Sequence, residues 1–461
     1  MSVVKANPSK SFFVDMITRD IELDAAILDL IDNCIDGVSR VIQNHQVDDY
    51  TGFYARLDLT SDSFKLSDNC GGIERRNAEN YAFRLGRDPN YNEDNDRQTI
   101  GMYGIGMKRA LFKIGNQSEV ITKCNQDAYK VTIPEGWADI ESWEFPITEC
   151  NDLTENGTTI LSNNLTSSAK ANFESSLFID ELKTEIQKHF SYILHKGFVV
   201  FLNGEKIEPL SVSFLVKEVA GVEPFVYKGN IDNVDITIVC GFITSPIKNS
   251  EEENEIATGN RSELAGWTII CNDRVVVYKD KTRLTGWGEN PVPQYHTQFI
   301  NISGVVRFTS NDAYRLPLTT TKRGIDNNSE LYMYIRGVMK EATKTFTDVT
   351  NKIKADYEAN KAALFNSTIS MTEKDVIDEY SVKAKSIIER KKFSSSTNES
   401  KYKPSVKVIS PRSETVTVRF QKLKSELSLV ADYLNIDPEQ YSKTAEKAFE
   451  QVLLEAKKMG G

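Results

Sequence analysis

The chain has 461 residues, of which 40% are hydrophobic and 26% are charged, and its formal net charge is -10. This length exceeds what a single hydrophobic core usually supports, so we expect two or three domains of ordinary globular composition. The acidic balance excludes a protein whose whole surface is basic for binding nucleic acid, although a local basic groove remains compatible with it.

The N-terminal sequence MSVVKANPSKSFFVDMITRD lacks the basic start and the continuous apolar core of a signal peptide. No stretch approaches the ~20 apolar residues that are needed to cross a bilayer. The six cysteines form no C-x-x-C pair, and the four histidines show no ligand-like spacing. We therefore expect a cytoplasmic protein with no membrane segment, no structural zinc and no disulfide scaffold.

The first part of the chain, up to about residue 210, predicts an α+β domain. An amphipathic run over residues 23–38 is followed by the strand-like segments FYARLDL and FKLSD. The segment GRDPNYNEDNDRQTI is polar and aperiodic, which indicates a long loop at about 86–103, of the kind that forms lids. A helix around 178–194 then leads to the strand GFVVFLNGEKI, in which Asn203-Gly204 is a hairpin turn signal.

The rest of the chain predicts three further parts. Residues 211–328 contain the strand-like runs DITIVCGFI, GWTIICNDRVVVY and ISGVVRF, which predict a strand-rich domain. Residues 329–392 have a helical pattern. The serine-rich stretch FSSSTNESKYKPS predicts a flexible linker at 393–409, and residues 410–461 predict a small module with the strand VTVRF and two helices.

Three polar residues share one face of the first long helix. In DLIDNCID, Asp29, Asn33 and Asp36 recur at i, i+4 and i+7, whereas leucine and isoleucine cover the other faces. A buried helix keeps acids on one stripe only when something polar lies opposite. This face is therefore a candidate binding surface.

Three glycine-containing segments follow that helix. LSDNCGGI places Asp68 and Gly72 at the end of a strand, where glycine lets the backbone approach a flat ligand, but alone it is equally well an ordinary turn. In IGMYGIGMKRA, glycines run into a helix that carries Lys108, and such a helix start offers N–H groups and a positive dipole to phosphate, although a lone glycine run is weak support. ENGTTIL opens a strand with the hydroxyl of Thr158, and alone it is no more than a strand start.

Taken together and in this order, the four segments are far more specific than any one of them. No G-x-x-x-x-G-K-S/T sequence occurs, which excludes a P-loop nucleotide site. The chain resembles the GHKL ATPase superfamily, which includes DNA gyrase B, MutL, the heat-shock chaperone and the histidine kinases. DLIDNCID is similar to the N-box, DNCGGI to the D-x-G-x-G box, GMYGIGMKRA to the glycine-rich lid-and-phosphate box, and GTT to the adenine-side threonine.

The resemblance is strong over residues 11–165 and extends weakly to about 345. Within the superfamily, IGMYGIGMKRA, CNDRVVVYKDKTRLTGWG and LPLTTTKRGID look most like MORC-type proteins and their bacterial relatives. The resemblance implies an α+β protein. Its N-terminal GHKL (Bergerat) α/β sandwich would cover 1–210, followed by a transducer-like α+β domain at 211–328 and a helical C-terminal region.

The resemblance also implies roles for single residues. Asn33 would bind Mg²⁺, a hard cation that bridges triphosphate oxygens and keeps several waters. Asp68 would accept from the adenine amino group, with Thr158 supporting it through water, and Lys322 would reach the γ-phosphate from the second domain. The residues expected to bind the nucleotide are Asn33, Asp36, Asp68, Gly72, Gly101, Gly104, Ile105, Gly106, Met107, Lys108 and Thr158.

Two positions depart from the family pattern. Asp29 stands where the family usually has the glutamate that activates water, and its side chain is shorter by one C–C step of ~1.5 Å. Because a misplacement of about 1 Å can cost ~100-fold in rate, we expect slow hydrolysis with Asp29 and Lys322 as the catalytic residues. The neighbouring carboxylate, Asp32, lies about 300° around the helix from Asp29. Cys70 replaces the first glycine of the D-x-G-x-G box, whereas Gly72 is kept.

These features predict an ATPase that works as a nucleotide-gated conformational clamp. If the γ-phosphate attracts Lys322 and orders the lid, nucleotide state is coupled to the angle between domains and to dimer closure. We expect a homodimer on ATP binding that acts on DNA or on DNA-bound proteins. The bacterial resemblance adds an operon-encoded effector such as a nuclease, in anti-phage (antiviral) defence.

Other classes remain open. A chaperone of the heat-shock GHKL type is compatible with the long helical C-terminal half, and suppression of client aggregation instead of ATP-dependent DNA retention would identify it. A histidine or protein kinase is less favoured, because no histidine lies in a recognisable dimerisation helix before the ATP domain. The basic run Arg390-Lys391-Lys392 could touch a phosphate backbone, although such a run is more often a solvated helix end.

Overall fold

The computed structural model shows two compact units, Met1–Ile409 and Ser410–Gly461. The residues that it describes are 9–42, 49–84, 105–150, 152–210, 212–217, 222–246, 264–319, 324–354, 357–386, 397–408 and 421–459. The expected lid at about 86–103 lies outside these residues, as do Gly101, Gly104 and Lys322.

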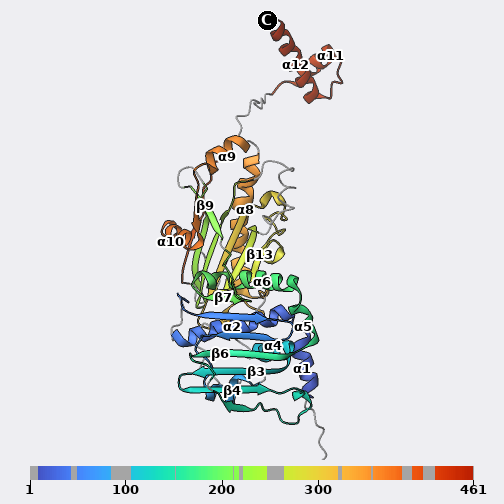
Figure 1. The fold of residues 1–461 in the computed structure, drawn as a ribbon. Helices are drawn as coiled ribbons and strands as arrows, with labels where there is room; N and C mark the ends of the chain where they lie inside the picture. The colour runs from blue at the N-terminus through green and yellow to red at the C-terminus, as the bar shows by residue number, and fades with distance from the viewer. Residues whose placement is uncertain are drawn as a thin grey trace, which may run out of the picture. The chain divides into compact units, whose positions relative to one another are not determined.

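An 8-stranded sheet forms the N-terminal part of the first unit (Figure 1). Its order is β5-β4-β3-β6-β2-β1-β7-β8, and all neighbours are antiparallel except β1 and β7. The strands are β1 (Tyr54–Leu59), β2 (Phe64–Asp68), β3 (Gly115–Cys124), β4 (Asp127–Ile133), β5 (Ile147–Glu149), β6 (Gly157–Leu165), β7 (Val199–Leu202) and β8 (Glu205–Lys206). Asn203 and Gly204 join β7 to β8 with positive φ at both residues, which confirms the predicted hairpin turn.

The helices of this part pack together against the sheet. They are α1 (Lys10–Arg19), α2 (Leu23–Ile42), α3 (Arg75–Asn77), α4 (Gly106–Ile114), α5 (Ser167–Phe173) and α6 (Ser176–His195), with a short π-helix at Ala78–Ala82. In α2 the apolar residues Ala26, Ile27, Ile31 and Val38 are fully buried in one core with α4, α6 and the strands. The amphipathic helix predicted from the sequence is confirmed, and its burial fixes where its polar face points.

A 7-stranded sheet forms the rest of the first unit, in the order β13-β12-β14-β11-β10-β17-β16. These strands are β10 (Phe225–Ile231), β11 (Val234–Phe242), β12 (Gly266–Cys271), β13 (Arg274–Asp280), β14 (Ile302–Thr309), β16 (Lys385–Ser386) and β17 (Thr397–Tyr402). In β11, Ile236 and Ile238 pack in the core with α8 (Glu330–Ile353), whereas Val239 packs in the core with α10 (Glu373–Lys383). Helices cover both faces, so these strands read as nearly continuous apolar runs in the sequence.

Strands occur where the sequence predicted a helical region and a linker. β15 (Ile369–Thr372) interrupts the expected helical region at 329–392, between α9 (Tyr357–Phe365) and α10, and pairs with β9 (Ser213–Val216). β17 lies within the expected linker at 393–409 and pairs with β10. The linker prediction is wrong there, because sheet pairing and hydrogen bonds from the Tyr227 and Tyr334 hydroxyls to Glu399 (2.9 and 2.7 Å) hold a polar segment that has no strand periodicity.

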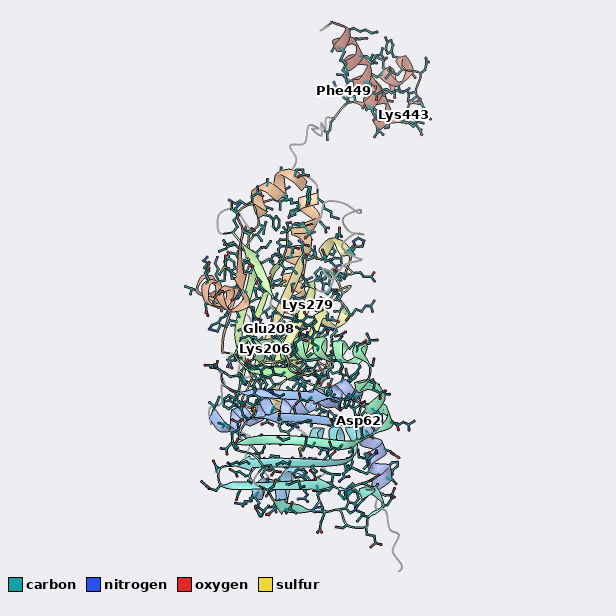
Figure 2. The ribbon with its side chains drawn as sticks, in the orientation of Figure 1. Asp62, Lys206, Glu208, Lys279, Lys443 and Phe449 are labelled. Atoms are coloured by element: carbon teal, nitrogen blue, oxygen red, sulfur yellow. The ribbon has the colours of Figure 1, made fainter. Side chains whose placement is uncertain are left out.

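The second unit contains α11 (Lys424–Tyr433) and α12 (Tyr441–Met459), which contact each other. Ala431 and Thr444 are buried, whereas Phe449 on α12 is exposed (Figure 2). Two helices were predicted here, and the predicted strand VTVRF lies outside the described residues. Among the described helices of both units, none combines the length and the apolar character that crossing a membrane requires.

Candidate functional site

The carboxylate of Asp29 lies against the start of α4. Arg109 donates from Nε to Asp29 Oδ2 at 2.8 Å and also from Nη2, which forms an ion pair. A Cβ atom at Gly106 would lie only 3.2 Å from the same Oδ2, so the glycine lets α4 approach the acid this closely. Two segments almost eighty residues apart in the sequence therefore meet at one carboxylate.

The first turn of α4 is arranged like an anion-binding helix start. Ile105 is its N-cap and supplies no side-chain cap, and the Ile105 carbonyl accepts from Arg109 N at 3.0 Å. Uncapped N–H groups of a first turn, together with the helix dipole, favour a negatively charged ligand. Met107 is half-buried and packs against the core, which anchors this turn to the sheet domain.

Lys108 points to the segment that precedes the expected lid. It is buried, its Nζ donates to the Ala82 carbonyl at 2.8 Å, and burial lowers the pKa of its ammonium to about 8. Ala82 ends the π-helix, two residues before the last described residue of that segment. Lys108 therefore links α4 to the end of the π-helix.

Asn33 carries a buried amide nitrogen without a hydrogen-bond partner among the described residues. A buried polar atom of this kind costs free energy unless a ligand or water satisfies it. Asn33 lies one helical turn beyond Asp29 on α2, on the same face. The free nitrogen is a donor and fits a phosphate oxygen, and the oxygen of the same amide fits Mg²⁺, which takes oxygen ligands beside phosphates and waters. The described part of the chain holds no cluster of three or more His, Cys, Asp or Glu side chains suited to a metal ion.

Asp68 ends β2 at the opposite end of the α2 face. Its Oδ1 accepts from Cys70 N at 2.8 Å, and its Oδ2 accepts from the Cys34 thiol at 3.5 Å. Burial raises the pKa of Asp68 to about 6. The two hydrogen bonds, a further one from the backbone of Thr158, and the charge of Arg40 all oppose that rise. The carboxylate is thus held in place, with a pKa close to the physiological range.

Glycines bring the backbone close around Asp68. Gly72 has φ +73°, and a Cβ atom there would lie 2.1 Å from the carbonyl oxygen of Lys123. A Cβ atom at Gly157 would lie 2.0 Å from the Asp68 carbonyl oxygen. No larger residue fits at either position without moving backbone, which gives the glycines of DNCGGI and ENGTT a steric role.

Thr158 lies next to Asp68 in the sheet. β2 and β6 pair Asp68 with Thr158, and β3 and β6 pair Thr122 with Thr158. The hydroxyls of Thr122 and Thr158 lie 3.3 Å apart, and Thr122 Oγ1 also accepts from Ile73 N at 2.9 Å. Thr122 therefore joins the Gly72 turn to Thr158. Sequence reasoning missed it, because nothing in ITKC marks a functional threonine.

Asp36 lies deeper than the sequence predicted for a nucleotide ligand. It is buried, and its charge adds to burial and to the charge of Asp273 in raising the pKa of the Tyr50 hydroxyl. The structure thus brings together Asp29 and the start of α4 at one end, and Asp68, Gly72 and Thr158 at the other, while Asn33 lies on α2 between them. Arg109 and Arg40 were missed by sequence reasoning, since an arginine in a helix gives no signal of the acid that it faces.

Residues 21–157 match the model of the histidine kinase-, DNA gyrase B- and HSP90-like ATPase family. No curated protein matches the chain. The matched range begins just before α2 and ends at Gly157, so it encloses Asp29, Asn33, Asp68, Gly72 and the start of α4. Residues 21–157 of this chain are therefore an ATPase domain of the GHKL superfamily.

Proposed function

We propose that this chain binds Mg-ATP along the polar face of α2 and hydrolyses it slowly, with Asp29 as the base that activates water. The observation that carries the proposal is the position of α2 between the two ends of the site. Asp29 lies at the start of α4, Asn33 follows one helical turn later, and Gly37 lies against Cys70, next to Asp68. Eight residues of helix separate Asp29 from Gly37, a rise of about 12 Å. This spacing supports a site with the phosphates at the Asp29 end of α2 and the adenine at the Gly37 end.

Each residue has a distinct task in this proposal. The start of α4, from Ile105 to Lys108, faces the phosphates, and Asn33 holds Mg²⁺, which would neutralise phosphate charge when bound. Asp68 accepts from the adenine amino group, and Thr158 supports it. Arg109 holds the carboxylate of Asp29 in place through Oδ2. Gly101, Gly104 and Lys322 remain proposed phosphate ligands.

The ATP affinity is expected to depend on pH through Asp68. Its pKa of about 6 means that lowering the pH from 7.5 to 5.0 protonates the carboxylate and removes the negatively charged acceptor. ATP affinity should fall about tenfold over this range in the wild type, because about one tenth of the carboxylate stays ionised one unit below the pKa. Calorimetric titration at several pH values measures it.

Asp68→Asn provides the matched control, because the ATP phosphates titrate in the same range. The variant should bind more weakly at pH 7.5 and should retain only the pH dependence that the phosphates cause. The ratio of wild-type to variant affinity should therefore approach one at pH 5.0. A ratio that does not change with pH would remove Asp68 from the adenine site.

We further propose that the nucleotide drives a conformational clamp of the MORC-like type, which dimerises on ATP and acts on DNA or DNA-bound proteins. The support is that the 7-stranded sheet contacts the nucleotide domain directly, since β13 contacts α6 and Arg274 pairs with Asp32 of α2. A change at α2 therefore has a physical route into the second sheet. An effector nuclease in anti-phage defence belongs to the same proposal.

Sedimentation velocity and a DNA-retention assay test the clamp. With Mg²⁺ and a non-hydrolysable ATP analogue, the wild type should sediment as a dimer and stay on closed-circular DNA after a salt wash, but not on linear DNA. Asn33→Ala should remain monomeric and wash off both. A wild type that stays monomeric, ignores DNA topology and suppresses aggregation of an unfolded client would favour the chaperone function instead.

A further inference from the structure

The β12–β13 hairpin reaches from the 7-stranded sheet to the nucleotide domain. Asn272 and Asp273 form its two-residue turn, with φ of 45° and 69°. Positive φ at both turn residues is the type I′ geometry, which fits the twist of a hairpin and makes it stiff. The next residue, Arg274, pairs with Cys271 as the first residue of β13. The turn therefore fixes the direction in which Arg274 leaves the hairpin.

Arg274 forms an ion pair with Asp32 of α2. Both residues are buried, with 2% and 6% of their surfaces exposed. The guanidinium also lies over the Phe190 ring of α6, 5.1 Å from its centroid. Burying two charges is costly unless they meet in good geometry, so a pair of this kind is a poor source of stability compared with apolar packing. The position of this ion pair, between the second sheet and α2, therefore indicates a role other than stabilising the fold.

The rest of the hairpin turn is also tied down on both sides. Asp273 accepts from Lys196 Nζ at 2.8 Å and lies 3.5 Å from the Tyr50 hydroxyl, and both of these partners belong to the nucleotide domain. Asn272 donates to the Ser310 carbonyl at 2.9 Å and accepts from Ser310 N at 3.0 Å. Ser310 follows the end of β14. One turn therefore links α2, the end of α6 and the end of a strand in the second sheet.

Asp32 lies between the two residues that the proposed mechanism uses on α2. It precedes Asn33 directly, and Asp29 lies three positions earlier. At 100° per residue, a contact that holds Asp32 fixes the rotation of the helix about its axis, and with it the directions of Asp29 and Asn33. A rotation of 20° at a side-chain radius of about 6 Å moves a side-chain tip by roughly 2 Å, which is enough to lower the rate by ~100-fold.

We propose that Arg274 is a positioning residue for ATP hydrolysis. Through Asp32 it sets the rotation of α2 so that Asn33 and Asp29 face the start of α4. The inference rests on the proposed function of these two residues and deepens it, because it gives the second sheet a part in the reaction of the first. The proposed path from α2 through Asn272 to Ser310 would carry a change of α2 into the second sheet.

Three variants of the full chain test this role. Arg274→Met leaves a buried carboxylate without its cation, so its melting temperature should fall by about 10 °C. The double variant Asp32→Asn, Arg274→Met removes both charges, and its melting temperature should return to within a few degrees of the wild type. The kcat of the double variant should stay at least tenfold below that of the wild type, and Mg²⁺ should no longer increase its affinity for ATP. Arg307→Met is the matched control, because it breaks the 2.8 Å ion pair between Arg307 of β14 and Glu373 of α10 without touching α2.

The readouts separate positioning from folding and from failure of the proposed function. Arg307→Met should lose stability but keep the wild-type kcat and the Mg²⁺-dependent gain in affinity. If the double variant recovers kcat and this gain together with its melting temperature, Arg274 is only structural and the inference is overturned. If the wild type binds ATP without turnover, the increase in ATP affinity on addition of Mg²⁺ is the readout that tests whether Arg274 positions α2. If the wild type binds no ATP, the proposed function itself fails, and this appears before any variant is compared.

Discussion

Asn33→Ala is expected to abolish Mg²⁺-dependent ATP binding and hydrolysis. The alanine removes an amide whose buried nitrogen lacks a hydrogen-bond partner among the described residues. Metal coordination is worth several kcal/mol in the transition state, so turnover should fall at least about 100-fold. Calorimetric titration of ATP with and without Mg²⁺, together with phosphate release, measures both effects.

The fold of Asn33→Ala should remain intact. Removing a buried donor that has no partner in the described part of the chain leaves no new unsatisfied group, so the melting temperature should stay within a few degrees of the wild type or rise. Asn172→Ala on α5 is the matched control. It removes an asparagine that donates to the Ser168 carbonyl at 2.8 Å, and it should leave ATP binding unchanged. If Asn33→Ala still gains affinity from Mg²⁺, Asn33 does not hold the metal.

Asp29→Asn is expected to separate binding from hydrolysis. The amide keeps the size and the contact with Gly106 but cannot take a proton from water. General base catalysis contributes 10²–10⁴-fold, so phosphate release should fall by at least about 100-fold. The affinity for Mg-ATP should change by no more than about threefold, because the proposed ligands at Asn33 and Asp68 are untouched. Single-turnover phosphate release and equilibrium titration measure the two quantities.

Asp62→Asn is the control for the loss of one carboxylate. Asp62 lies in the turn between β1 and β2, and 84% of its side chain is exposed (Figure 2). This variant should hydrolyse ATP like the wild type. Because Arg109 loses its anionic partner in Asp29→Asn, the melting temperature of that variant must be recorded as well. Undiminished phosphate release from a folded Asp29→Asn would assign the base to another group.

Local patterns predicted the parts of this protein that depend on neighbours in the sequence. The helix of DLIDNCID follows from the spacing of its apolar residues, and the turn at Asn203-Gly204 follows from two residues that tolerate positive φ. The apolar runs of β11, β12 and β14 are readable because both faces of their sheet are buried. In the N-terminal part of the chain, the order of the glycine segments after DLIDNCID was enough to indicate a nucleotide site.

Short polar strands could not be predicted in this way. β17 has no apolar alternation, and the alternation of β15 spans only four residues, so each becomes a strand only because β10 or β9 offers it hydrogen-bonding partners. Their strand conformation depends on pairing across the fold and only weakly on propensity. The linker expected at 393–409 failed for this reason, since composition alone reads a serine-rich segment as a flexible chain.

By itself, the sequence indicated a GHKL ATPase domain, which the family model matches over residues 21–157, and it gave the candidate residues for the nucleotide site. The tertiary structure decided what those residues face. Arg109 at Asp29, Thr122 at Thr158 and Arg274 at Asp32 each come from an element at least thirty residues away along the chain. These long-range contacts depend on how helices and strands pack. Packing brings two residues together without producing a periodic pattern in the sequence of either segment. Charges that act across a fold are therefore visible only after the chain has folded.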